Sequence, residues 1–323
     1  MAVYTKVSIN EVKKLLQNYN IGDLIRIDEI QQGVENSNFK LTTKSGNYIL
    51  TLYEKRVNPE DLPYFIGLMN YYSERGIPCP KPIVDKHNNI LQKLSNKDAA
   101  IISFLPGKQI ISPNHYHCFQ LGELIGKMHL TGLDFSTNRN NSLGMLTWKP
   151  LFKICQKNNH FLKDVDVKLI NTLLDKLEKY WPNNLKCGQI HADLFTDNIF
   201  FEKENLTGVI DFYFSCSDIL IYDLAITIND WCFNSEGNLN FKNVHSIISG
   251  YSSIRDLKTK EFEAMPILLE GAALRFFLTR LYDWVNTNPD SLVIKKDPIE
   301  YLNKIKYYQN IDQFDFLEKL KRF

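Results

Sequence analysis

The sequence has little net charge and no long apolar run, and these two absences exclude several classes of protein. Its 38 lysine and arginine residues nearly balance its 37 aspartate and glutamate residues, which leaves a net charge of +1. Such a balance provides no basic field for binding nucleic acid or a membrane surface. Apolar stretches such as Ala99–Ile102 are far too short to span a bilayer, and the polar residues 1–10 do not resemble a signal peptide. We expect a cytoplasmic protein without nucleic-acid or membrane partners.

Cysteine is scarce and is not arranged for metal binding or redox chemistry. The six cysteines are Cys79, Cys118, Cys155, Cys187, Cys216 and Cys232. None of them forms the closely spaced pairs that zinc sites and dithiol motifs use. The pattern predicts reduced, buried thiols.

Two common nucleotide-binding signatures are also missing. Gly107 and Lys108 are followed by Gln109 and lack the upstream glycine of a GxxxxGK[ST] loop, and no GxGxxG motif occurs. P-loop and dinucleotide-binding folds are therefore not indicated. There is no repeat, low-complexity tract or long linker either. A chain of 323 residues without these features favours two lobes that share a cleft.

The first 105 residues have the pattern of a β-rich lobe. Ser8 and Glu11 form a capping box for a helix that ends near Tyr19, and Asn58 begins a second helix that Gly76 ends. Runs typical of strands occur at residues 24–31, 37–43, 47–54, 83–84, 90–94 and 99–105. These elements predict a mainly antiparallel sheet with one crossing helix.

From residue 106 onward the pattern is helical. Helical periodicity occurs at residues 113–131, 165–181, 219–233, 241–251, 258–286 and 298–307. A short strand-turn-strand region at residues 188–211 interrupts it. The sequence therefore predicts an α+β protein, with an N-terminal nucleotide-binding lobe at residues 1–105 and a larger, mainly helical catalytic and substrate-binding lobe at residues 106–323.

One polar loop in the region 188–211 has the residue spacing of a kinase catalytic loop. His191 lies two residues before Asp193, and Asn198 lies five residues after it. Phosphoryl transfer needs a carboxylate that orients the attacking hydroxyl and accepts its proton, and an oxygen ligand that holds Mg²⁺ against the phosphates. Asp193 and Asn198 fit these two roles. His191 is expected to orient the loop by hydrogen bonding, and Asp223 is expected to brace it.

A second acid follows at the end of an apolar strand. Asp211 lies thirteen residues after Asn198, and a hairpin of residues 198–201 and 207–210 would bring the two side chains together. Asp211 is therefore the expected principal Mg²⁺ ligand. Taken singly, such residues usually cap turns, but their combination in the helical half of the chain favours an ATP-dependent phosphotransferase.

A polar turn in the N-terminal half is suited to covering the nucleotide phosphates. It spans Gln32–Phe39, contains a single glycine and includes Asn36, Ser37 and Asn38. Backbone N–H groups and these side chains could bind phosphate oxygens. An ordinary hairpin turn is the alternative interpretation.

The motifs together resemble the homoserine kinases, a protein-kinase-like family within the aminoglycoside-phosphotransferase and choline-kinase group. The resemblance covers nearly the whole chain and rests on Gly33–Phe39, Tyr48–Glu54, Asp61–Phe65, Gly76–Pro80, His191–Phe195, Ile210–Phe214, Tyr222–Ala225 and Leu274–Trp284. It implies a protein-kinase-like fold that uses ATP and Mg²⁺ to convert L-homoserine into O-phospho-L-homoserine, a step toward threonine.

The same resemblance implies roles for individual residues. Asp193 would be the catalytic base, and Asn198 and Asp211 would be the Mg²⁺ ligands. The adenine-binding hinge would be formed by Ser103, Phe104 and Leu105.

The strand at residues 47–54 departs from the protein-kinase pattern. It has Thr51 where protein kinases place the lysine that pairs with the phosphates, a feature that the homoserine kinases are expected to share. Lys40, Lys55 and Arg56 are the candidates for the missing cation, although a lysine near a strand end is usually just solvated.

A selective homoserine site needs a cation for the carboxylate and an anion for the ammonium group. Arg275, Arg280 and Asp283, all predicted on one long helix, offer both. An Arg280–Asp283 ion pair within the helix is the alternative. Tyr213 and Trp284 are expected to form walls of the pocket, although an aromatic side chain at such a position more often lies in the core.

Other functions remain open at this point. The near-neutral charge and the paired arginines favour an amino-acid substrate over choline, methylthioribose or an aminoglycoside. A protein kinase is less favoured because no Ala-Pro-Glu segment follows Asp211. A non-catalytic scaffold is less favoured because the three motif residues are intact. We expect a monomer or a weak homodimer.

Overall fold

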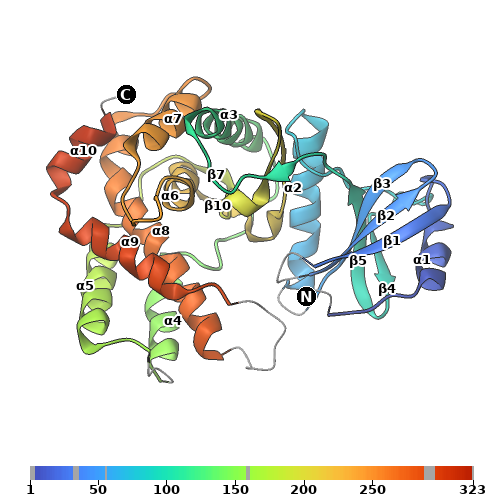
Figure 1. Cartoon of the computed structure of the whole chain (residues 1–323), viewed down its shortest axis with the longest axis horizontal. Coiled ribbons are helices and arrows are strands. Elements are labelled where there is room, and N and C mark those ends of the chain that lie inside the picture. The colour runs from blue at the N-terminus through green and yellow to red at the C-terminus, as the bar shows by residue number, and fades with distance from the viewer. Residues whose placement is uncertain (1–3, 32–35, 55–56, 158–160, 287–294, 322–323) are drawn as a thin grey trace. The chain divides into compact units, whose positions relative to one another are not determined.

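The computed structural model describes residues 4–31, 36–54, 57–157, 161–286 and 295–321. They form two compact units, both drawn in Figure 1. Unit 1 contains the described residues up to Gly107 together with Thr207–Tyr213, and unit 2 contains the other described residues. The lobe boundary expected after residue 105 thus omits the segment Thr207–Tyr213, because a chain that returns to an earlier unit leaves no local signal in its composition.

Unit 1 is built on a five-stranded sheet with the order β1-β2-β3-β5-β4, and each adjacent pair of strands is antiparallel. The strands are β1 (Leu24–Ile30), β2 (Ser37–Thr43), β3 (Gly46–Leu52), β4 (Leu91–Leu94) and β5 (Lys97–Ser103). This confirms the predicted antiparallel sheet. The strand expected at residues 83–84 is wrong: Pro82 makes an isolated bridge to Ile102, beside a hydrogen bond from the N–H of Ile83 to the carbonyl of Ile101. The pairing stops there because the next residue of this edge of β5, Ala100, pairs with Leu91 of β4.

Buried and more exposed side chains alternate along β2, which distinguishes the two faces of this sheet. Phe39, Leu41 and Leu50 are buried on one face, in a cluster with Val12 and Leu15 of α1 (Ile9–Leu16). The predicted capping box is present, since the N–H of Glu11 donates to Ser8 and the N–H of Ser8 donates to the Glu11 carboxylate. The side chains between these core positions lie on the opposite face.

The second helical segment of unit 1 begins as the sequence predicts. Asn58 caps the 3₁₀ turn η1 (Pro59–Asp61), which leads into α2 (Leu62–Glu74), and Gly76 follows with a φ of 79°. The later segment Thr207–Tyr213 packs against α2: the rings of Tyr72 and Phe212 lie 6.0 Å apart, and those of Phe65 and Tyr213 lie 5.8 Å apart. Asp211, which directly precedes Phe212, therefore belongs to unit 1.

Unit 2 is mainly helical. Its helices are α3 (His115–Gly132), α4 (Met145–Lys157), α5 (Asp164–Tyr180), α6 (Leu220–Trp231), α7 (Phe241–Ser252), α8 (Thr259–Asn286), α9 (Pro298–Asn310) and α10 (Gln313–Lys321). The six helices predicted from the sequence are all present and begin and end within three residues of the expected positions. The sequence does not predict α4, which contains Pro150, or α10, whose only buried side chains are Phe316 and Leu320.

Short strands support the polar loop of unit 2. They are β6 (Lys108–Gln109), β7 (Cys187–Ile190), β8 (Ile199–Glu202) and β10 (Cys216–Ile219), while β9 (Asn205–Val209) runs from unit 2 into unit 1. β7 is antiparallel to β10, and β6 is antiparallel to β8. The sequence does not predict β10, because its four residues are too few to show a clear alternation.

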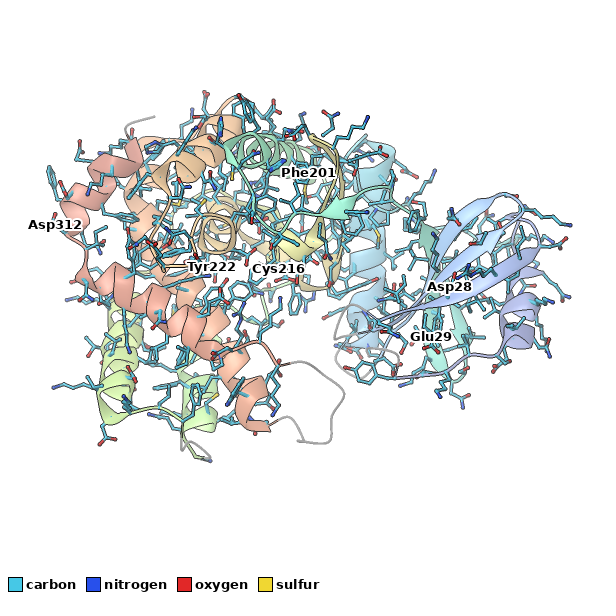
Figure 2. The ribbon with its side chains drawn as sticks, in the orientation of Figure 1. Asp28, Glu29, Phe201, Cys216, Tyr222 and Asp312 are labelled. Atoms are coloured by element: carbon cyan, nitrogen blue, oxygen red, sulfur yellow. The ribbon has the colours of Figure 1, made fainter. Side chains whose placement is uncertain are left out.

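The centre of unit 2 is α6, a helix that is buried along almost its whole length and that includes Tyr222, labelled in Figure 2. In Figure 1 it lies inside the bundle, with α3, α7 and α8 around it. Two glycines bring α3 and α7 into backbone contact: a Cβ on Gly122 would lie 2.1 Å from the carbonyl oxygen of Ile247, and one on Gly250 would lie 2.0 Å from that of Phe119. Among the described helices, none combines the length and the apolar character needed to cross a membrane.

Candidate active site

The polar loop of unit 2 connects β7 to β8 and is held in a tight fold by its own backbone. The N–H of Phe195 donates to the carbonyl of Asp193 at 2.8 Å, and the N–H of Asn198 donates to the carbonyl of Phe195 at 3.0 Å. The 3₁₀ turn η2 (Thr196–Asn198) follows from this second bond. The loop residues therefore occupy fixed positions at the ends of two strands.

Asp193 and Asn198, which the sequence predicts to act together, are in direct contact. The Nδ2 atom of Asn198 donates to the backbone oxygen of Asp193 at 2.8 Å and to its carboxylate Oδ2 at 2.9 Å. Both hydrogen bonds use Nδ2, so neither of them involves Oδ1, the atom of this amide that can bind a cation. Asn198 is buried, and Asp193 is partly exposed.

The residue before Asp193 has a strained backbone. Ala192 has a φ of 64°, a left-handed conformation that costs an alanine roughly 1–2 kcal/mol. Hydrogen bonds hold it from both sides: its N–H donates to Asp223 Oδ1 at 2.7 Å, and its carbonyl accepts from Arg275 Nη1 at 2.6 Å. The N–H of His191 donates to Asp223 Oδ2 at 2.7 Å. Asp223 makes the contact expected of it, and His191 is buried beside it.

The part of the loop after Asp193 is anchored by two residues that no sequence motif reveals. The N–H of Thr196 donates to Asp230 Oδ2 at 2.8 Å, and the indole of Trp231 donates to the carbonyl of Leu194 at 3.0 Å. Burial raises the pKa of Asp230 above its usual value. Both anchors lie on α6, the helix that also carries Asp223, so this one helix holds both ends of the loop.

Lys296, just before α9, also contacts the loop. Lys296 pairs with Asp197 at 3.0 Å, and its ammonium lies 5.1 Å from the centre of the Phe195 ring. Both partners of the ion pair are about half exposed. No motif spacing links Lys296 to the loop, so only the folded chain shows this contact.

Asp211 lies in unit 1 and shares one feature with the loop in unit 2. Its φ is 67°, so a second motif residue has the left-handed backbone that is typical of functional positions. Burial first, and then Tyr213 and Asp211, raise the pKa of the neighbouring Tyr53 well above its usual range. The hydroxyls of Tyr53 and Tyr213 are 3.3 Å apart. Tyr213 therefore packs in unit 1 against Tyr53 and Phe65.

The polar residues predicted at the nucleotide turn are organised by one acid. The N–H of Glu54 donates to Asn36 Oδ1 at 3.2 Å, and the hydroxyl of Ser37 donates to Glu54 Oε1 at 2.8 Å. Lys97 pairs with the same carboxylate at 2.9 Å. Residues 32–35, at the centre of the predicted turn, lie outside the described residues.

Thr51, which stands where protein kinases have a lysine, is bonded to the neighbouring strand. Its hydroxyl donates to Asn38 Oδ1 at 2.7 Å, and the two residues are direct partners in the β2–β3 register. Thr51 is almost fully buried. Of the cations considered from the sequence, Lys55 and Arg56 lie outside the described residues.

The predicted hinge lies at the end of β5. The hydroxyl of Ser103 accepts from the N–H of Lys81 at 2.8 Å. The ring of Phe104 is partly exposed, and the ammonium of Lys40 lies 4.5 Å from its centre. Leu105 packs against Gly208, where a Cβ would lie 2.7 Å from Leu105 Cδ1.

The two arginines of α8 are both buried. Arg275 is 2% exposed and donates to the catalytic loop, while Arg280 is 8% exposed and pairs with Glu300 of α9 at 2.6 Å. Asp283 is partly exposed. The ring of Trp284 is partly exposed, and its centre lies 5.6 Å from that of Phe161. The structure thus gives Arg275 a contact with the loop that the sequence does not predict.

Comparison with known proteins assigns the chain to a family. Residues 26–256 match the phosphotransferase enzyme family. A homoserine kinase from Rhizobium meliloti (strain 1021) is 47% identical over 311 residues, which cover 96% of this chain and 95% of that protein. The chain belongs to the homoserine kinase family. Another member, from Rhodospirillum rubrum, is 46% identical and covers 96% of this chain and 97% of its own length. The resemblance drawn from the motifs is confirmed.

Solved structures support the fold of this family member. An amicoumacin kinase in complex with AMP-PNP, Ca²⁺ and Ami superposes with a TM-score of 0.69 at 14% identity, covering 98% of this chain and 96% of that one. Similarity at this level of identity concerns the fold alone. It confirms the protein-kinase-like architecture, with an antiparallel sheet in one unit and helices in the other.

The donor atoms of the motif residues suit a magnesium ion of the kind that kinases use. Within the described ranges, no group of three or more His, Cys, Asp or Glu side chains is arranged to hold a metal by itself. Asn198 and Asp211 offer hard oxygen atoms, which Mg²⁺ prefers, and kinases complete the coordination shell with phosphate oxygens and water. Each of these two side chains, taken by itself, therefore offers a donor atom of the kind that Mg²⁺ binds.

Proposed function

We propose that the chain transfers the γ-phosphoryl group of ATP to the side-chain hydroxyl of L-homoserine, which yields ADP and O-phospho-L-homoserine. The observation that carries this proposal is the 47% identity with the homoserine kinase of Rhizobium meliloti over 96% of this chain. The intact contact between Asp193 and Asn198 supports it, because a non-catalytic relative would not need both side chains in this geometry.

In the proposed reaction Asp193 is the catalytic base. Its carboxylate accepts a hydrogen bond from the homoserine hydroxyl, whose oxygen attacks the γ-phosphorus while the bond to the β,γ-bridging oxygen breaks. The hydroxyl proton passes to Asp193, and ADP leaves with the bridging oxygen. The hydrogen bond from Asn198 to Oδ2 restricts the rotation of the carboxylate. His191 would keep the loop backbone in place.

Asn198 and Asp211 are the proposed magnesium ligands. When bound, the ion would neutralise charge on the transferring phosphoryl group and on ADP. The two hydrogen bonds donated by Asn198 Nδ2 support this role, since they fix the amide plane and with it the direction of Oδ1. The left-handed backbone of Asp211 supports a functional role for that residue as well.

The nucleotide side of the proposal rests on residues of unit 1. The residues proposed to contact ATP are Asn36, Ser37, Asn38, Thr51, Ser103, Phe104 and Leu105. The partly exposed ring of Phe104 offers a face for the purine, and the ammonium of Lys40, 4.5 Å from that ring, is the proposed nearby cation. The hydroxyl of Thr51 is bonded to Asn38, and this pair would orient the amide toward phosphate oxygens.

Homoserine recognition is assigned to the residues around α8. Arg280 and Asp283 are proposed for the carboxylate and the ammonium group, and Tyr213 and Trp284 are proposed as walls. Arg275 is proposed to act on the same site indirectly, by holding the catalytic loop, because its guanidinium donates to the carbonyl of Ala192 at 2.6 Å. This assignment predicts different kinetic effects for the two arginines.

A coupled assay of ADP release tests the proposal. Wild type, Asp193→Asn and the matched exposed control Asp164→Asn are each supplied with Mg-ATP and one of L-homoserine, L-serine, L-threonine, choline or methylthioribose. The proposal predicts selective turnover of L-homoserine, lost by about a thousandfold in Asp193→Asn and retained in Asp164→Asn. Preference for another alcohol would overturn the substrate, and full activity of Asp193→Asn would overturn the base.

A further inference from the structure

Asp223 receives one more hydrogen-bond donor than the catalytic loop provides. Besides the N–H groups of His191 and Ala192, its Oδ2 lies 3.2 Å from Nε2 of His129 on α3. His129 is 1% exposed, and Asp223 is fully buried. The residue that braces the loop is therefore itself held by a side chain from another helix.

From His129 the contacts continue to a second acid. Its Nδ1 lies 2.9 Å from the hydroxyl of Tyr251, which accepts from Arg255 Nη1 at 3.1 Å. Arg255 Nη2 in turn donates to Glu261 Oε1 at 2.7 Å. Tyr251 and Glu261 are both buried. We name this chain of five side chains, Asp223, His129, Tyr251, Arg255 and Glu261, the buried relay.

The chemistry of its two ends fixes the direction of every hydrogen bond in the buried relay. Arg255 can only donate, so the Tyr251 oxygen accepts from it and the Tyr251 O–H is left to donate to His129 Nδ1. The Asp223 carboxylate can only accept, so His129 Nε2 carries the proton. Both ends thus favour the same arrangement of His129, in which Nε2 donates and Nδ1 accepts.

Helix packing supplies the precision that such a chain requires. His129 lies on α3 and Tyr251 lies on α7, and the backbones of these two helices touch at Gly122 and Gly250. Close-packed helices leave little freedom for the distance between the two side chains. Arg255 and Glu261 connect the end of α7 to the first turn of α8.

We propose that Tyr251 and Arg255 are positioning residues for phosphoryl transfer, because they hold in place the His129 ring that supports Asp223, and Asp223 in turn holds the strained backbone of Ala192. This inference rests on the proposed function, in which Ala192 precedes the catalytic base. A left-handed alanine persists only where its surroundings determine it strongly. Loosening the buried relay shifts Asp193 from its attacking geometry without removing any group that touches substrate or nucleotide.

The test compares Tyr251→Phe with Tyr308→Phe, both in the full chain. Each removes one buried hydroxyl of unit 2, but the Tyr308 hydroxyl bonds to Asn229, outside the buried relay. We expect Tyr251→Phe to lower kcat about tenfold, with KM for ATP and L-homoserine changed less than about twofold. Tyr308→Phe should keep its kcat. Equal loss of kcat in both variants would overturn the proposal.

A second pair of variants guards against a folding artefact. Arg255→Lys keeps a donor for Tyr251, whereas Arg255→Met does not, so the lysine variant should restore most of the kcat that the methionine variant loses. Thermal melting of each variant separates this effect from general loss of fold. Equal kcat values for the two variants would overturn the role of Arg255.

Nitrogen NMR of the imidazole of His129 gives a readout that needs no turnover. The resonance is assigned by its loss in His129→Gln. Wild type should show His129 as the single Nε2–H form with a hydrogen bond accepted at Nδ1, and Tyr251→Phe should keep the Nε2–H form but lose the shift that the hydrogen bond causes at Nδ1. If wild type turned over no substrate yet showed this tautomer, the proposed function would fail while the buried relay stood. A mixture of tautomers in wild type would contradict the hydrogen-bond directions on which the buried relay depends.

Discussion

Asn198 donates a hydrogen bond from Nδ2 to Oδ2 of Asp193 at 2.9 Å, so the proposed metal ligand also orients the proposed base. Removing this side chain should therefore damage two functions at once. We expect Asn198→Ala to lower kcat by about a hundredfold or more and to raise the Mg²⁺ concentration needed for half-maximal rate. Titration of ADP release with Mg²⁺ measures both effects. An unchanged Mg²⁺ requirement would contradict the role of Asn198 as a ligand.

Arg275 separates a role in the loop from a role in substrate binding. Its guanidinium donates to the carbonyl of Ala192 at 2.6 Å and is 2% exposed. Arg275→Met should lower kcat by roughly tenfold to a hundredfold, with little change in KM for L-homoserine, because it loosens the loop and not the substrate site. Steady-state kinetics measure both constants. A raised KM with an unchanged kcat would instead assign Arg275 to direct substrate contact.

Arg280 is expected to contribute to stability through α9. Its ion pair with Glu300 is buried on the arginine side and half exposed on the glutamate side, and Lys304 pairs with the same carboxylate. Arg280→Met should destabilise the chain by about 1–3 kcal/mol, and a double-mutant cycle with Glu300→Gln should give a coupling of about 1 kcal/mol. Urea unfolding measures both values. Strict additivity would show that the pair contributes nothing.

Asp230 should make stability depend on pH. Burial raises its pKa in the folded state, so the folded chain binds this proton more tightly than the unfolded chain, whose carboxyl titrates near about 3.9. Its stabilising contribution is complete below that value and is lost as pH rises through the folded pKa. Asp230→Asn keeps an acceptor for Thr196 and should gain stability relative to wild type as pH rises above about 3.9.

Unfolding by urea at several pH values checks the prediction for Asp230. Asp164→Asn, on the exposed first turn of α5, serves as the control and should change little across the same range. A difference between Asp230→Asn and wild type that stays constant with pH would show that the buried carboxyl does not titrate in this window.

Much of the fold can be predicted from local patterns. The capping box at Ser8, the strand at residues 37–43 and the long helix α8 are all present because their signals lie within a few neighbouring residues. The helix α4 could not be predicted in the same way, because Pro150 normally marks the end of a helix. The four-residue strand β10 is too short to carry a period, and its pairing with β7 provides its hydrogen bonds.

The candidate site also contains residues that local sequence signals reveal and residues that only long-range contacts reveal. Asp193 and Asn198 are found from the sequence because their spacing is local, and the structure brings their side chains together. His129 and Tyr251 are not found, because they meet only where α3 and α7 touch, 122 residues apart in the chain. The sequence makes Arg275 a candidate for substrate contact, but its neighbours in the chain do not reveal that its guanidinium reaches the loop backbone.

The most direct test of the central claim is phosphorus NMR of the product formed from ATP, Mg²⁺ and L-homoserine, compared with authentic O-phospho-L-homoserine. The proposed function predicts that wild type converts the γ-phosphate signal of ATP into this phosphomonoester and ADP, while Asp193→Asn leaves ATP intact. Formation of inorganic phosphate alone, or of no product from L-homoserine while another alcohol is phosphorylated, would contradict it.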